Sequence, residues 1–70
     1  MVGRVELIVS SQNYGVITDE HRQRFVFVRS SVADGQFDSL AAHEAVIFEP
    51  RKTADGGRAV TVRSVGAGRP

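Results

Sequence analysis

Hydrophobic and polar residues alternate along five short segments of this chain, as they do in β-strands that bury one face. The predicted strands cover residues 2–10, 14–18, 24–29, 45–52 and 59–65. Residues 30–44 show no such alternation and contain a predicted turn at Asp34-Gly35 and one helical turn near Leu40. Pro50 indicates an edge position or a bulge in the fourth strand. Five short strands with a long connection after the third predict an all-β Greek-key barrel.

The third segment, residues 24–29, carries the most informative alternation. We place Val26 and Val28 in the core, and this puts Phe27 and Arg29 on the opposite, solvent-facing side. Folding alone explains a ring and a cation on the outside of a sheet poorly. A platform on which nucleic-acid bases stack needs both, so the pattern favours nucleic-acid binding.

Composition limits the remaining possibilities. Seventy residues make one small domain, and the absence of cysteine excludes disulfides and thiolate metal sites. No apolar run is long enough to span a bilayer and no signal-peptide pattern is present, so we expect a cytoplasmic protein. The net charge is only +1, although eight of the nine basic residues are arginine, which stacks on bases and binds phosphates in a fork geometry.

Candidate catalytic and metal-binding groups are sparse. His21 and His43 lie too far apart in polar surroundings to indicate a zinc site. No serine, histidine and carboxylate stand at a motif spacing, and no acidic cluster indicates a two-metal centre. We therefore expect neither an enzyme nor a cofactor. Arg51, Lys52 and Arg58 surround the last predicted hairpin, where they can keep an edge strand from pairing with other chains.

The segment order and several motifs resemble the bacterial cold-shock proteins, over about residues 3–65. The family's first ribonucleoprotein motif, Lys-Gly-Phe-Gly-Phe-Ile, falls on residues 12–17. Its second, Val-Phe-Val-His-Phe, falls on residues 26–30. A loop aromatic of the family falls on Phe37, and the Val-x-Phe of its fourth strand falls on residues 46–48.

The resemblance implies an OB-fold barrel over residues 1–66, followed by a flexible tail at 67–70. It also implies binding of single-stranded RNA or DNA by base stacking, in an RNA chaperone or a regulator of transcription or translation. The bases would stack on Tyr14, Phe27 and Phe37. The apolar platform would be filled by Leu7, Ile8 and Val16, and the backbone would be held by Arg4 and Arg29.

Several positions depart from the family pattern. Leu7 and Ile8 replace its Trp-Phe pair, Val16 replaces a phenylalanine, Arg29 replaces its histidine and Glu6 replaces a lysine. Each lost ring removes about 1–3 kcal/mol of stacking per base, so we expect weaker binding than in typical members. The same departures favour an alternative: a diverged domain that uses this face to contact a protein partner or a second copy of itself.

Overall fold

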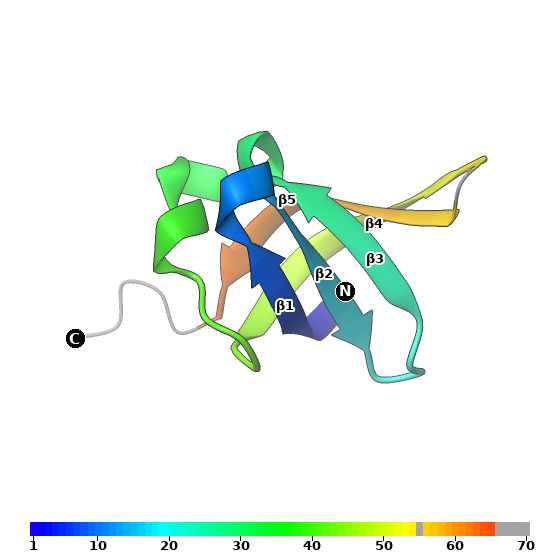
Figure 1. The fold of residues 1–70 in the computed structure, drawn as a ribbon. Coiled ribbons are helices and arrows are strands. Elements are labelled where there is room, and N and C mark those ends of the chain that lie inside the picture. Colours follow the sequence, from blue (N-terminus) through cyan, green and yellow to red (C-terminus); the bar gives the residue numbers. More distant parts are fainter. Residues whose placement is uncertain (55, 66–70) are drawn as a thin grey trace.

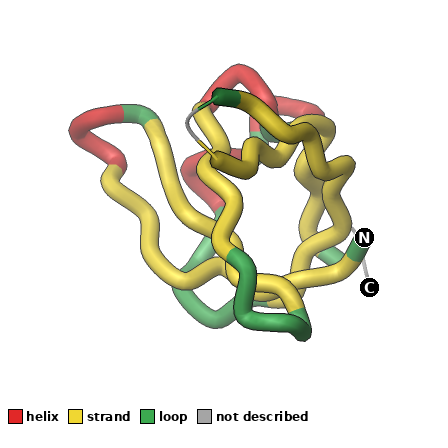
Figure 2. The backbone as a smooth tube through the Cα atoms, turned by 90° about the vertical axis from the view of Figure 1, so that its right-hand side faces the viewer, coloured by secondary structure: helices red, strands yellow, loops and turns green. Residues whose placement is uncertain are grey.

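Five strands form a closed barrel in the computed structural model, which describes residues 1–54 and 56–65. Their bounds are Val2–Val9 (β1), Tyr14–Asp19 (β2), Arg24–Val28 (β3), Ala45–Thr53 (β4) and Gly56–Ser64 (β5). The spatial order is β1-β2-β3-β5-β4, with β3 and β5 parallel and every other pair antiparallel. Figure 1 labels the strands, and Figure 2 shows the backbone of the barrel from the side. The predicted five-stranded barrel is therefore confirmed. Asp55 of the predicted last turn and the predicted tail at 67–70 lie outside the described residues.

The long connection between β3 and β4 contains three short 3-10 turns. They are Arg29–Ser31 (η2), Ala33–Gly35 (η3) and Phe37–Ser39 (η4), and a further turn, Ser10–Gln12 (η1), joins β1 to β2. The helical turn predicted near Leu40 lies slightly earlier, at η4, because Leu40 itself is extended. Phe37 and Leu40 point into the core, so this connection covers one end of the barrel (Figure 1).

The barrel interior is filled by apolar side chains from every strand. Val5, Ile17, Val46 and Val62 are completely buried. Phe48 is buried as well, so the Val-x-Phe of residues 46–48 places both of its apolar side chains on the inward face of β4. Since nothing covalent reinforces the fold, this apolar core is its main source of stability.

The inward face of β3 differs from the prediction. Phe25 and Phe27 point into the barrel, with exposed fractions of 6% and 1%, whereas Val26 faces solvent. Each inward ring lies opposite a glycine, Phe27 beside Gly15 and Phe25 beside Gly57. A methyl group at Gly15 would come within 2.5 Å of the Phe27 ring, so these glycines provide the space that the rings occupy.

Irregular positions also interrupt the expected alternation in β1 and β5. The register with β2 shifts between Val5 and Leu7, and this bulge turns Leu7 outward and Ile8 inward against the core. In β5, Thr61 has a left-handed backbone (φ 51°). Val60 and Val62 therefore do not share a face, although they stand two residues apart in a predicted strand: Val62 is buried and Val60 is half-exposed.

Candidate nucleic-acid interface

The outer surface of β1, β2 and β3 carries six apolar side chains in two adjoining rows. The register places Tyr14 between Val9 and Val28 in one row. It places Val16 between Leu7 and Val26 in the other. We call this surface the apolar face; its members are Leu7, Val9, Tyr14, Val16, Val26 and Val28. Leu7 and Val26 are 39% and 37% exposed, so the face is open to a ligand.

Tyr14 supplies the aromatic ring of the apolar face. All five aromatic residues of the chain lie in the described part, and the four phenylalanines are buried. The predicted exposure of Phe27 and Phe37 is therefore wrong, since each is 1% exposed, and neither ring can stack on a base in this conformation. Tyr14 is half-buried on the outer side of β2, as predicted.

Phe37 and Arg29 form a structural cluster at the end of β3. The Phe37 ring packs edge-on against Phe27 at a centroid distance of 6.0 Å, and the Arg29 guanidinium lies 4.6 Å from the Phe37 centroid. Arg29 also donates two hydrogen bonds to the Asp38 carboxylate, at 2.9 and 3.0 Å, and one to Asn13 Oδ1 at 2.9 Å. These bonds hold the pKa of Arg29 above its ordinary value and that of Asp38 below it. The charge of Arg29 is thus already paired.

A carboxylate lies at the other end of the apolar face. Glu6, at the bulge beside Leu7, accepts hydrogen bonds from the Thr18 hydroxyl and the Arg24 guanidinium. The Arg24–Glu6 ion pair is 3.1 Å long. The bond from Thr18 and the charge of Arg24 hold the pKa of Glu6 below its ordinary value. Glu6 is therefore negatively charged near neutral pH and neutralises the nearest cation.

Arg4 and Ile8 do not join the apolar face as predicted. Arg4 is exposed beside Thr18, where its Nη1 donates to the His43 carbonyl at 3.0 Å. Ile8 packs inward. The structure thus brings Leu7, Tyr14 and Val16 together among the eight predicted residues and separates the other five: Arg4, Ile8, Phe27, Arg29 and Phe37.

Sequence reasoning did not assign Val9, Val26 and Val28 to this surface. For Val26 and Val28 the error came from the register of the second motif, and for Val9 it came from the bulge in β1. Moving the motif back by one residue, onto residues 25–29, places its two valine positions at the buried Phe25 and Phe27. Gly15, spaced to pair with Phe27, is the signal in the sequence that could have revealed the correct register.

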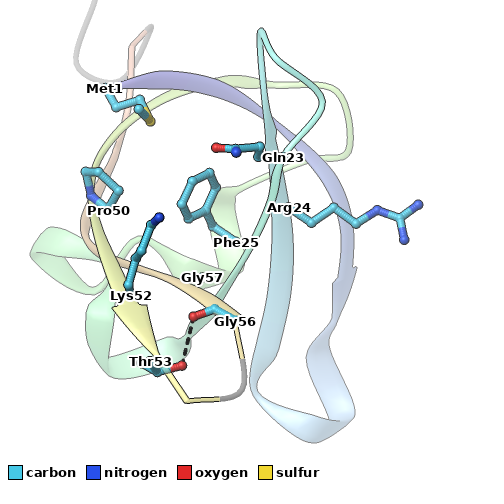
Figure 3. A pocket seen from close by; sticks show the side chains of 9 residues that line it. All are labelled: Met1, Gln23, Arg24, Phe25, Pro50, Lys52, Thr53, Gly56 and Gly57. Carbon is cyan, nitrogen blue, oxygen red and sulfur yellow. Dashed lines mark hydrogen bonds between the residues drawn. The ribbon is translucent and has the colours of Figure 1, made fainter.

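A separate cavity of about 640 Å³ opens at the barrel end beneath the β4–β5 hairpin. Phe25 lies at its centre, with Lys52 and Pro50 along β4 and Gln23 across from them (Figure 3). Arg24 points away from it. The described residues contain no group of three His, Cys, Asp or Glu side chains placed to hold a metal ion. Within the same residues, no helix has the length and apolar character needed to cross a membrane.

A closed five-stranded barrel with an exposed apolar sheet face is characteristic of oligonucleotide-binding barrels. Comparison with family models identifies the particular branch: residues 1–65 match the 'Cold-shock' DNA-binding domain. The chain belongs to this family, which is nucleic-acid-binding and non-enzymatic. Comparison with curated proteins gives no match.

Proposed function

We propose that this protein binds single-stranded RNA or DNA across the apolar face. The observation that carries the proposal is the grid of two rows and three strands, with Tyr14 in a central position between Val9 and Val28. An aromatic ring among small aliphatic side chains offers one stacking position, and the aliphatic side chains offer a flat apolar surface for neighbouring bases. Such contacts do not distinguish one base from another, so we propose binding without strong sequence preference.

The binding is proposed to be weak. One stacked base contributes about 1–3 kcal/mol, and the nearby cations Arg24 and Arg29 are already paired with carboxylates. Weak binding that tolerates any sequence suits a cytoplasmic role in keeping transcripts unpaired or in modulating transcription or translation. Lys or Arg contacts to phosphates would make the affinity fall with salt.

Substitution of Tyr14 tests the proposal. Binding of a labelled, pyrimidine-rich single strand is measured by fluorescence anisotropy at low salt for the wild type, Tyr14→Leu and Tyr14→Phe. We expect Tyr14→Leu to weaken binding by about 1–3 kcal/mol, or roughly 5- to 150-fold, because it removes the ring but keeps an apolar side chain. Tyr14→Phe keeps the ring and is expected to bind like the wild type. A folded wild type that binds no strand, or equal binding by Tyr14→Leu, would contradict the proposal.

A second candidate is docking of another copy of this chain on the same face. Five of the six side chains are aliphatic, and the Glu6 carboxylate beside Leu7 repels phosphates. Both features suit a protein surface as well as a nucleic acid. This candidate predicts a dimer in sedimentation experiments that Val26→Asp converts to monomer, together with no binding of oligonucleotides. A monomeric wild type excludes it.

A further inference from the structure

Two arginines extend one row of the apolar face onto the β4–β5 hairpin. Val26 of β3 pairs with Arg58 of β5, and Arg58 pairs in turn with Arg51 of β4. Side chains at paired positions lie on the same face of a sheet. The row that begins with Leu7 and Val16 therefore continues without interruption. It runs across all five strands in the order Leu7, Val16, Val26, Arg58, Arg51.

The surface is hollowed where this row passes from β3 to the hairpin. A cavity of about 230 Å³ is lined by Val26 and Val28 on the β3 side and by Arg51, Arg58 and Val60 on the hairpin side. Figure 1 shows the hairpin of β4 and β5 extending beyond the barrel next to β3. The apolar face and the two cations thus border the same groove.

Protection of a sheet edge explains only one of the two cations in this groove. That explanation suits Arg51, because β4 pairs with β1 only near residues 45–47. It fails for Arg58, because β5 at this position is paired with β3 on one side and β4 on the other. Like charges at directly opposed positions destabilise a sheet. Glu49 pairs with Arg51 at 3.0 Å, and no ion pair of Arg58 is found among residues 1–54 and 56–65, so the two cations together keep an excess positive charge. The pair is therefore suited to an anionic ligand.

We infer that Arg51 and Arg58 bind the phosphate backbone of the strand whose bases lie on the apolar face. The inference rests on the proposed function and extends its binding path from β1–β3 onto the hairpin. A guanidinium presents paired N–H donors that match a phosphate group. Two such groups beside Val26 and Val28 are placed to hold the backbone where the strand leaves the apolar face.

Strands of two lengths distinguish binding at the arginines from binding at the apolar face. Anisotropy titrations use labelled oligothymidines of three and nine nucleotides over a range of salt concentrations. We expect the double variant Arg51→Gln/Arg58→Gln to bind the short strand like the wild type but the long strand more weakly. Loss of two phosphate contacts should reduce the salt slope for the long strand by about 1.4, at about 0.7 per contact for single strands.

Arg63→Gln is the matched control. Arg63 is also an exposed arginine of β5 but is paired with Ile47, away from the groove. It should bind both strands like the wild type. Thermal unfolding confirms that each variant is folded, and the single variants replace the double one if it is not.

The outcomes distinguish the two proposals. This inference would be overturned, and the proposed function left intact, by one result: Tyr14→Leu weakens binding, but the arginine double variant keeps the affinity and the salt slope of the wild type. A folded wild type that binds neither strand would overturn both. An equal loss in Arg63→Gln would show a general charge effect and would also overturn the assignment to this groove.

Discussion

The two sides of β3 differ in a way that decides what the protein can bind. The inner side carries the rings of Phe25 and Phe27, packed in the core, and the outer side carries the aliphatic Val26 and Val28. The same five residues would make a stacking strand if the register were shifted by one. The number of aromatic residues in a sequence is thus a poor measure of stacking capacity, because their orientation determines whether a base can reach them.

The cause of this orientation lies on the neighbouring strands. Gly15 of β2 and Gly57 of β5 lie opposite the two inward rings and leave room for them. Inside the barrel, Phe25 also packs against Phe48 at a centroid distance of 5.0 Å. Burial of a phenylalanine is more favourable than burial of a valine because more apolar area leaves water. The glycines and the larger buried area together fix the register of β3.

The largest expected effect is the loss of stability on truncating the inner side. Phe27→Ala leaves a cavity in the core and should lower the free energy of unfolding by about 3–5 kcal/mol. Val26→Ala, on the outer side of the same strand, should change it by about 1 kcal/mol or less. Urea unfolding followed by circular dichroism measures both. Similar destabilisation by the two variants would show that the two sides of β3 do not differ as described.

The second-largest expected effect is a gain in oligonucleotide affinity when an aromatic ring is added to the outer side of β3. Val26→Phe places an aromatic side chain beside Val16, one strand from Tyr14, and should strengthen oligonucleotide binding by about 1–3 kcal/mol, roughly 5- to 150-fold. Val2→Phe adds the same ring at an exposed position that pairs with Ile47, away from the apolar face. It should leave the affinity unchanged. No gain in Val26→Phe would show that bases do not reach this row.

The strand pattern of this barrel could be predicted from local alternation, and the direction of its side chains only in part. The inward positions of Ile17, Val46 and Phe48 followed from period two, since no bulge interrupts β2 or the start of β4. Period two fails after the bulge beside Val5 and at Thr61. Each of these irregularities moves the following side chains to the other face, and nothing in the local sequence marks its position.

The candidate site was predictable to a similar extent. Leu7, Tyr14 and Val16 lie on the outer surface. The expectation for Tyr14 and Val16 followed from their alternation with the buried Gly15 and Ile17, and that for Leu7 followed from the family resemblance. Their role in binding stays a prediction. The sequence of the third segment is compatible with two registers, one with the phenylalanines inward and one with the valines inward. Phenylalanines and valines alternate there, and either set can fill a core. Pairing between distant strands, such as Phe25 with Gly57, resolves the ambiguity. Alternation within one segment carries no information about such pairs.

The smallest expected effect comes from the carboxylate at the end of the apolar face. Glu6→Gln removes a negative charge beside Leu7 and frees Arg24 from its ion pair, so binding of a polyanion should strengthen by about two- to threefold at low salt and by less at high salt. Glu20→Gln, an equal charge change in the exposed β2–β3 loop, serves as the control and should have a smaller effect.

The pH dependence of binding provides an independent test of the charge on Glu6. The Thr18 hydroxyl and Arg24 hold the pKa of Glu6 below its ordinary value, so the carboxylate stays charged at a more acidic pH than an ordinary glutamate does. The affinities of the wild type and Glu6→Gln should therefore differ at neutral pH and converge as the pH falls through that pKa. Anisotropy titrations of both proteins across this range measure the convergence. A difference that persists in acid would mean that the substitution acts through the shape of the β1 bulge and not through charge.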